Sequence, residues 1–195
     1  MMARGPSGET ACGRLLRKVK KGRLRANAKV ILEGSEGSFI MSYPPKLSEI
    51  ISLFESLPDP EKRDTLIVFA DNAGNQVPRS GERFDLEDVR KDEECTDTVG
   101  IFLRVNPDNS SHFRVSLGPQ VQTLTKAMTS ILCKGLEGVS PQELLDVPAD
   151  FVPKIVGADL VRQRSQTVYY ILTRMKSAAR VWLNRQRAIN AAASV

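Results

Sequence analysis

Apolar residues recur at helical spacing in two neighbouring stretches near residue 50. The first covers residues 48–57, and Pro58 ends it. Its apolar positions are Leu47, Ile50, Ile51 and Phe54. In the second stretch, Asp59 is expected to cap the helix, Pro60 suits its first position and Gly74 stops it. The expected inward face of this second helix is Leu66, Phe69, Ala70 and Ala73. The pattern therefore predicts a helical hairpin.

The pattern changes after residue 74. Residues 75–94 contain many charges, a proline and a glycine without an apolar period, which predicts a polar loop that ends at Cys95. Residues 98–105 and 112–117 are rich in β-branched and aromatic side chains, and the turn-forming residues 106–109 separate them. We therefore expect an antiparallel hairpin with Cys95 directly before its first strand.

Helical spacing returns at Gln120, and Gly135 is available as a stop. The apolar positions of this helix are Val121, Leu124, Met128, Ile131 and Leu132. Ser140 and Glu143 have the spacing of a capping box, with a proline at the first helical position. A short turn over residues 151–156 leads to a last helix with one apolar stripe, which is typical of a core-packing helix. The stripe consists of Val168, Ile171, Leu172, Met175, Ala179 and Trp182.

These elements define one α+β domain, with a helical hairpin, a small antiparallel sheet and C-terminal helices. The 195 residues and the ordinary apolar fraction of 41% suit one globular domain with a real core. We expect a basic segment over residues 1–40, the folded domain over residues 43–188 and a short tail over residues 189–195.

The charge is unevenly distributed along the chain. The net charge is +5, but residues 1–31 carry nine Lys and Arg against the single acid Glu9, so the remainder is acidic overall. After Asp159 every residue is neutral or basic. A uniformly basic nucleic-acid binder would not have this distribution.

The basic N-terminal segment has two interpretations. It lacks the apolar region of a secretory signal peptide, and its basic, acid-poor composition is that of an organellar transit peptide. The alternative is a disordered basic tail that touches nucleic acid or an anionic surface. Cys12 lies in this segment and receives no role.

Several classes of protein are excluded by the composition. No run approaches the roughly 18 apolar residues of a membrane-spanning helix. Three widely spaced cysteines do not form a disulfide framework and indicate a reducing compartment. The chain has no glycine-rich phosphate loop and no paired cysteine motif, and His112 is its only histidine, so we expect neither a metal nor an organic cofactor.

A series of short motifs in the C-terminal third resembles the SufE family. The motifs are Lys134 to Gly138, Ser140 to Leu145, Asp150-Phe151 and Arg164-Ser165-Gln166, with Cys95 upstream. The resemblance extends from Tyr43 to Trp182. It implies an acceptor of persulfide sulfur from a pyridoxal-phosphate-dependent cysteine desulfurase. Such an acceptor stimulates the desulfurase and passes sulfur to an iron–sulfur scaffold complex, as a carrier and activator rather than a stand-alone enzyme. The composition of the basic N-terminal segment indicates an organellar location, with a plastid favoured over a mitochondrion and the cytoplasm as the alternative.

The resemblance implies Cys95 as the sulfur-accepting residue and Arg164 as the arginine that steadies the loop or the persulfide. The family typically reads Gly-Cys-x-Ser-x-Val-Trp here, whereas this chain retains only Cys95 and Val99 and has Gly100 in place of the aromatic. Four acids at positions 92, 93, 94 and 97 favour the neutral thiol, so they raise the pKa of Cys95 above its reference of about 8.5. Arg164 has an alternative as a helix-start arginine paired with Asp159.

Two other residues offer competing chemistry. Cys133 follows Ile131 and Leu132 on a helix, where a free cysteine is most simply a small core hydrophobe. His112 and Cys95 could form a catalytic pair, but a role at the edge of a strand is the simpler prediction for His112.

Three alternatives remain open at the level of sequence. The altered Cys95 loop is also consistent with a non-catalytic SufE-like domain that only binds a partner. A basic-tailed nucleic-acid-binding protein is the other class, although the acidic middle of the chain disfavours it. A homodimer through the last helix is a further alternative to a monomer.

Overall fold

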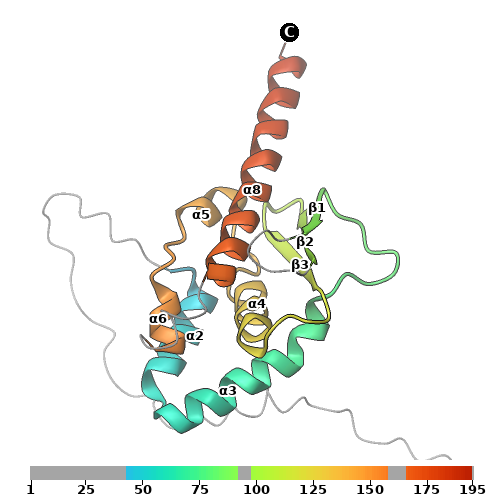
Figure 1. Cartoon of the computed structure of the whole chain (residues 1–195). Helices are drawn as coiled ribbons and strands as arrows, with labels where there is room; N and C mark the ends of the chain where they lie inside the picture. Colours follow the sequence, from blue (N-terminus) through green and yellow to red (C-terminus); the bar gives the residue numbers. More distant parts are fainter. Residues whose placement is uncertain (1–42, 92–97, 158–165, 195) are drawn as a thin grey trace, which may run out of the picture. The chain divides into compact units, whose positions relative to one another are not determined.

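A computed structural model describes residues 43–91, 98–157 and 166–194, which belong to one compact unit. A three-stranded antiparallel sheet carries helices on one face (Figure 1). Helix α8 (Gln166–Ala193) packs against β1 and β2, and α4 (Thr123–Gly135) packs against β3. This arrangement confirms the predicted α+β class.

The first two described helices are α2 (Pro45–Ser56) and α3 (Asp59–Asp71), and both pack on α4. Their predicted inward faces are buried, except that Ile50 is only partly covered. Phe54 and Phe69 join the two helices, with ring centroids 6.0 Å apart.

Two details of α3 differ from the prediction. Pro58 occupies the cap position and Asp59 is the first helical residue, without a side-chain capping bond. The helix ends at Asp71 and continues as the 3-10 helix η1 (Asn72–Gln76), so Gly74 does not stop it. The Asn72 side chain donates to the Val68 carbonyl at 2.6 Å, which satisfies one of the last open carbonyls of α3.

The sheet consists of β1 (Leu86–Lys91), β2 (Thr98–Val105) and β3 (Ser111–Leu117), in that order. The hairpin of β2 and β3 is confirmed, and β1 corrects the predicted loop over residues 75–94. Cys95 precedes β2, the first strand of this hairpin, as predicted, and the unpredicted β1 places it between two described strands in the sequence.

Alternation along the strands places the core on the helical side of the sheet. The buried residues of this face are Val99, Ile101, Leu103, Phe113 and Val115. The predicted turn also forms: the Asn106 amide donates to the Ser110 carbonyl at 2.9 Å, and Asn109 takes a φ of 63°. Asparagine tolerates this left-handed conformation better than most residues.

The C-terminal helices follow the predicted pattern. In α5 (Pro141–Asp146), the Glu143 amide donates to the Ser140 hydroxyl at 3.2 Å, and the Ser140 amide donates to the Glu143 carboxylate at 3.1 Å. This confirms the capping box. Helix α6 (Phe151–Val156) forms where a short turn was expected.

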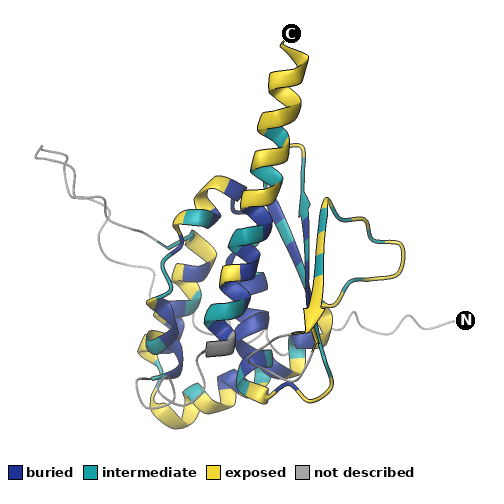
Figure 2. Cartoon of the chain, turned by 45° about the horizontal axis from the view of Figure 1, so that its top comes forward, coloured by how far each residue is buried: buried dark blue, intermediate teal, exposed yellow. Residues whose placement is uncertain are grey.

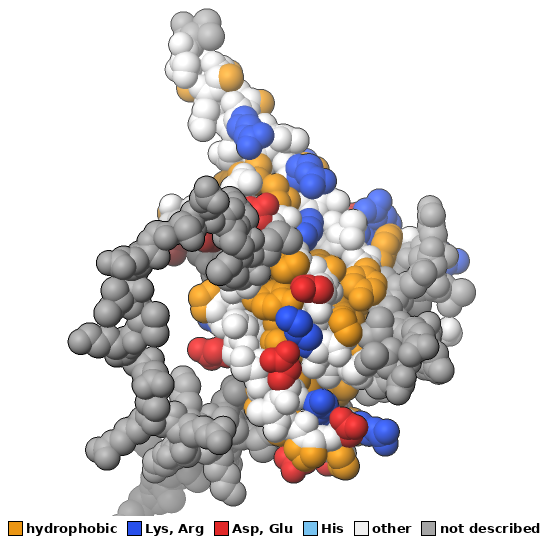
Figure 3. Space-filling view, turned by 90° about the vertical axis from the view of Figure 1, so that its left-hand side faces the viewer, with side chains coloured by type: hydrophobic (Ala, Val, Ile, Leu, Met, Phe, Trp, Pro, Cys, Tyr) orange, Lys and Arg blue, Asp and Glu red, His pale blue; other side chains and the backbone are white. Residues whose placement is uncertain are grey.

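The apolar stripe of α8 is confirmed, with Trp182 partly buried at its end. Beyond Trp182 the side chains are mostly exposed, and these final turns extend past the other described elements (Figure 2). Their charged residues are Arg185 and Arg187. On the face shown in Figure 3, basic side chains but no Asp or Glu are visible along these turns. Among the described helices, none is long and apolar enough to cross a membrane.

Candidate functional site around the β1–β2 connection

The two predicted site residues, Cys95 and Arg164, lie outside the described residues, and their roles remain predictions. The described residues that flank them are informative. Lys91 at the end of β1 pairs directly with Thr98 at the start of β2. Since paired residues of antiparallel strands lie roughly 5 Å apart, the chain leaves and re-enters the sheet at neighbouring positions. Residues 92–97, with Cys95 among them, join these two positions.

The flanking strand ends carry positive charge. Arg90 and Lys91 are exposed at the end of β1, and Arg174 of α8 is buried behind the same strands. Arg164 was the only cation predicted from the sequence to act on Cys95. The helical spacing of Arg174 indicates that it is buried. It lies three residues after Ile171 and four before Ala178, on the buried side of α8.

Gly100 stands where the family typically has an aromatic residue, and the structure provides the reason this loss is tolerated. A side chain at position 100 would place its Cβ 2.4 Å from Ser116 Oγ and 2.8 Å from Phe102 Cε2. Phe102 follows Gly100 by two residues on the same face of β2, so its ring fills the space that the missing side chain leaves. Phe84 packs on this ring, with centroids 5.3 Å apart.

Restoring the family residue alone is therefore expected to destabilise the domain. Gly100→Trp forces Phe102 and Ser116 aside, which should cost about 1–3 kcal/mol in chemical denaturation. In the double variant Gly100→Trp/Phe102→Ala the new ring gains space, and the cost should be at least about 1 kcal/mol smaller than the sum of the single effects. Additive effects in this cycle would contradict the proposed exchange of aromatic rings.

Cys133 is confirmed as a core residue. It is only 2% exposed in α4, and burial raises the pKa of its thiol to about 12. A thiol with this pKa carries almost no thiolate near neutral pH, and the thiolate is the attacking form. Cys133 is therefore unsuitable as a sulfur acceptor.

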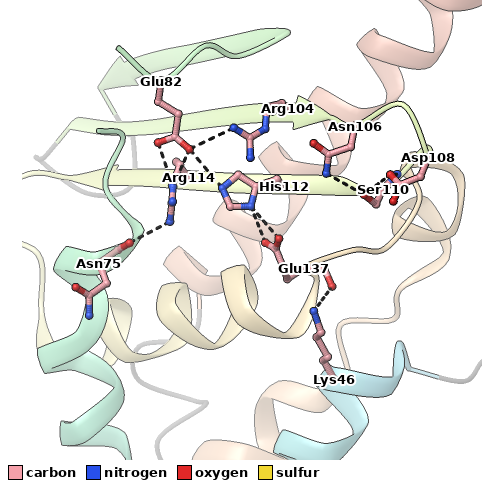
Figure 4. A network of polar contacts seen from close by, with 10 residues as sticks. All are labelled: Lys46, Asn75, Glu82, Arg104, Asn106, Asp108, Ser110, His112, Arg114 and Glu137. Atoms are coloured by element: carbon pink, nitrogen blue, oxygen red, sulfur yellow. Dashed lines mark hydrogen bonds and ion pairs between the residues drawn. The ribbon is translucent and has the colours of Figure 1, made fainter. Parts of the chain in front are cut away.

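His112 belongs to a charged cluster on the outer face of the sheet (Figure 4). Its Nδ1 lies 2.8 Å from a Glu137 oxygen, and its Nε2 lies 3.5 Å from a Glu82 oxygen. It pairs with Arg104, six residues along β2 from Thr98, a distance of about 20 Å. The cluster thus occupies the end of the hairpin away from the Cys95 connection, and both ring nitrogens face carboxylates.

Glu82 is the centre of this cluster. Arg114 Nε donates to both of its oxygens, at 3.2 and 3.3 Å, and Arg104 lies 3.8 Å away. Burial acts to raise the pKa of Glu82, but hydrogen bonds from the Arg79 amide and from Arg114 outweigh it, so the pKa is lowered. Arg114 also donates to the Asn75 carbonyl at 3.1 Å, which ties η1 to the sheet.

The lowered pKa of Glu82 predicts a defined dependence of stability on pH. A carboxylate with a depressed folded-state pKa contributes stability above its unfolded pKa of about 4.3, and this contribution is lost as the pH falls through the folded value. Glu82→Gln should therefore be destabilising at pH 7, with a deficit that shrinks between about pH 5 and pH 3. Denaturant unfolding over this range measures the effect, and the exposed Glu49→Gln serves as control. A deficit that does not change with pH would exclude the ionic role of Glu82.

No group of three or more potential metal ligands of the His, Cys, Asp and Glu types comes together within residues 43–91, 98–157 and 166–194.

The fold and the position of the cysteine connection define a small α+β protein built around a three-stranded sheet. The family profile "SufE: Fe-S metabolism associated domain" matches residues 48–179, and the chain belongs to this family. This confirms the resemblance seen in the sequence and associates the domain with iron–sulfur metabolism.

A solved structure supports the same fold. The solution structure of a hypothetical protein from Thermus thermophilus is similar, with a TM-score of 0.59 and 24% sequence identity. The match covers 73% of this chain and 99% of that one. No curated protein matches this chain.

Proposed function

We propose that this protein accepts persulfide sulfur on Cys95 from a cysteine desulfurase, stimulates that enzyme and delivers the sulfur for iron–sulfur cluster assembly. The observation that carries the proposal is the family match over residues 48–179, which encloses Cys95 and Arg164. The burial of Cys133 supports the choice of Cys95, because it removes the other cysteine of the matched region from the chemistry.

The transfer is a thiol–persulfide exchange. The Cys95 thiolate attacks the terminal sulfur of the enzyme-bound persulfide, and a new sulfur–sulfur bond forms as the old one breaks. The desulfurase cysteine leaves as a thiolate, so atoms and electrons balance without an external oxidant. Arg164 has the proposed role of steadying the loop or the persulfide anion. The pyridoxal phosphate that generates the persulfide belongs to the desulfurase.

A direct test measures alanine and sulfide release by a cysteine desulfurase with and without this protein. We expect this protein to stimulate the desulfurase in a saturable manner and to deliver the sulfur to an iron–sulfur scaffold complex. Absence of stimulation by folded protein would contradict the carrier function.

The second candidate is a non-catalytic SufE-like domain that binds a partner. The observation that favours it is the acidic sequence around Cys95, since four carboxylates disfavour the reactive thiolate. This candidate expects binding to the partner without sulfur on Cys95.

The location of the protein is a separate proposal. The basic composition of residues 1–40 suits import into an organelle, with a plastid favoured over a mitochondrion and the cytoplasm as the alternative. Import of a reporter fused to these residues tests it.

A further inference from the structure

Strand β1 is weakly anchored by apolar packing. It is the edge strand of the sheet, and only Leu86 and Asp88 of its six residues are partly buried. Val89 is 56% exposed. Hydrophobic burial therefore contributes little to holding this strand, although β1 leads directly into residues 92–97.

A buried arginine supplies a side-chain anchor. Arg174 is 2% exposed, and its Nε donates to Asp88 Oδ2 at 2.9 Å. Its Nη2 donates to the Asp88 backbone carbonyl at 2.5 Å, and its Nη1 donates to the Val99 carbonyl at 2.9 Å. One guanidinium thus holds the side chain and backbone of β1 together with the backbone of β2.

These contacts depend on the shape of arginine. The planar guanidinium presents five donors in a fixed fork, whereas a lysine ammonium is a compact charge on a flexible stem. Because the group is buried, each donor needs an acceptor, and removal of Asp88 would leave an uncompensated charge. Arg90 also approaches Asp88, at 3.2 Å, but it is half exposed and does not substitute for the buried contacts.

The contacts hold both strands that border the proposed reactive segment, at the start of β2 and in the middle of β1. Asp88 is three residues before Lys91, and Val99 directly follows Thr98. We infer that Arg174 and Asp88 are positioning residues, which fix the two ends of residues 92–97 so that Cys95 is presented to the sulfur donor. This inference rests on the proposed function. Neither side chain is assigned contact with the sulfur.

The test compares Arg174→Lys and Asp88→Asn with Ile155→Ala, which removes buried side-chain volume from α6. Amide hydrogen exchange is measured for residues 89–91. The alkylation rate of Cys95 by iodoacetamide is followed by peptide-resolved mass spectrometry. Both variants should exchange faster in β1 by about tenfold or more, with α4 unchanged, and the alkylation rate should change. The control should alter neither observable.

Desulfurase stimulation adds a measurement that a change in stability alone does not alter. Misplacement of a reacting group should lower the maximum stimulation by about tenfold, with the half-saturating concentration changed by less than about twofold. Unchanged exchange and alkylation, or the same losses in Ile155→Ala, would overturn the inference. If the wild type fails to stimulate the desulfurase, the proposed function fails, while exchange and alkylation still decide the positioning role.

Discussion

Cys95→Ser is expected to reduce desulfurase stimulation to the level without added protein. A serine hydroxyl cannot form the persulfide, so the exchange has no acceptor. Folded Cys133→Ser protein should stimulate the desulfurase fully, because the Cys133 thiol that it lacks is buried and has a pKa of about 12. Alanine and sulfide release with each variant measures the difference.

The same assay separates the proposed roles around Cys95. Arg164→Ala should lower the stimulation by about tenfold without abolishing it, since loss of one favourable charge corresponds to roughly one pKa unit of thiolate or persulfide stabilisation. Thermal unfolding of each variant controls for folding. Full stimulation by Cys95→Ser, or its loss only in Cys133→Ser, would contradict the assignment.

Neutralising the acids beside Cys95 is expected to make this thiol more reactive at pH 7. The four residues to change are Asp92, Glu93, Glu94 and Asp97, each to its amide. Their negative charges disfavour the thiolate, so the variant should have a lower Cys95 pKa, and each unit gives up to about tenfold more thiolate at pH 7. The pH at which alkylation is half-maximal should shift downward accordingly.

Salt gives an independent check of this electrostatic cause. Added salt should speed Cys95 alkylation in the wild type by screening the carboxylates, and this effect should nearly disappear in the fourfold variant. Amide substitutions at the exposed acids Asp59, Glu61 and Asp64 of α3 provide the matched control. An unchanged half-maximal pH in the fourfold variant would exclude the carboxylates as the cause of low thiol reactivity.

Elements with local signals in the sequence were predictable. The capping box at Ser140 and the stripe of α8 combine a specific start signal with a one-sided apolar pattern, and both are present. Strand β1 was missed because its sequence, LEDVRK, has neither apolar alternation nor a buried hydrophobic residue. Its pairing with β2 is a tertiary effect, which a pattern within six residues does not contain.

The candidate site was predictable only in part. Cys95 and Arg164 came from the family resemblance, and the structure does not describe them. The contacts of Arg174 join α8 to strands more than 70 residues away in sequence, so only the fold brings them together. The ring of Phe102 occupies the space beside Gly100, where the family typically has an aromatic residue. This arrangement likewise depends on the side-chain directions along β2.

The most direct test of the sulfur-acceptor function is mass spectrometry of this protein after incubation with a cysteine desulfurase and cysteine, before any reductant is added. We predict that the peptide containing Cys95 gains the mass of one sulfur atom, and that the peptide containing Cys133 does not. Desulfurase turnover with no added sulfur on Cys95 would contradict the sulfur-acceptor function and favour a partner-binding role.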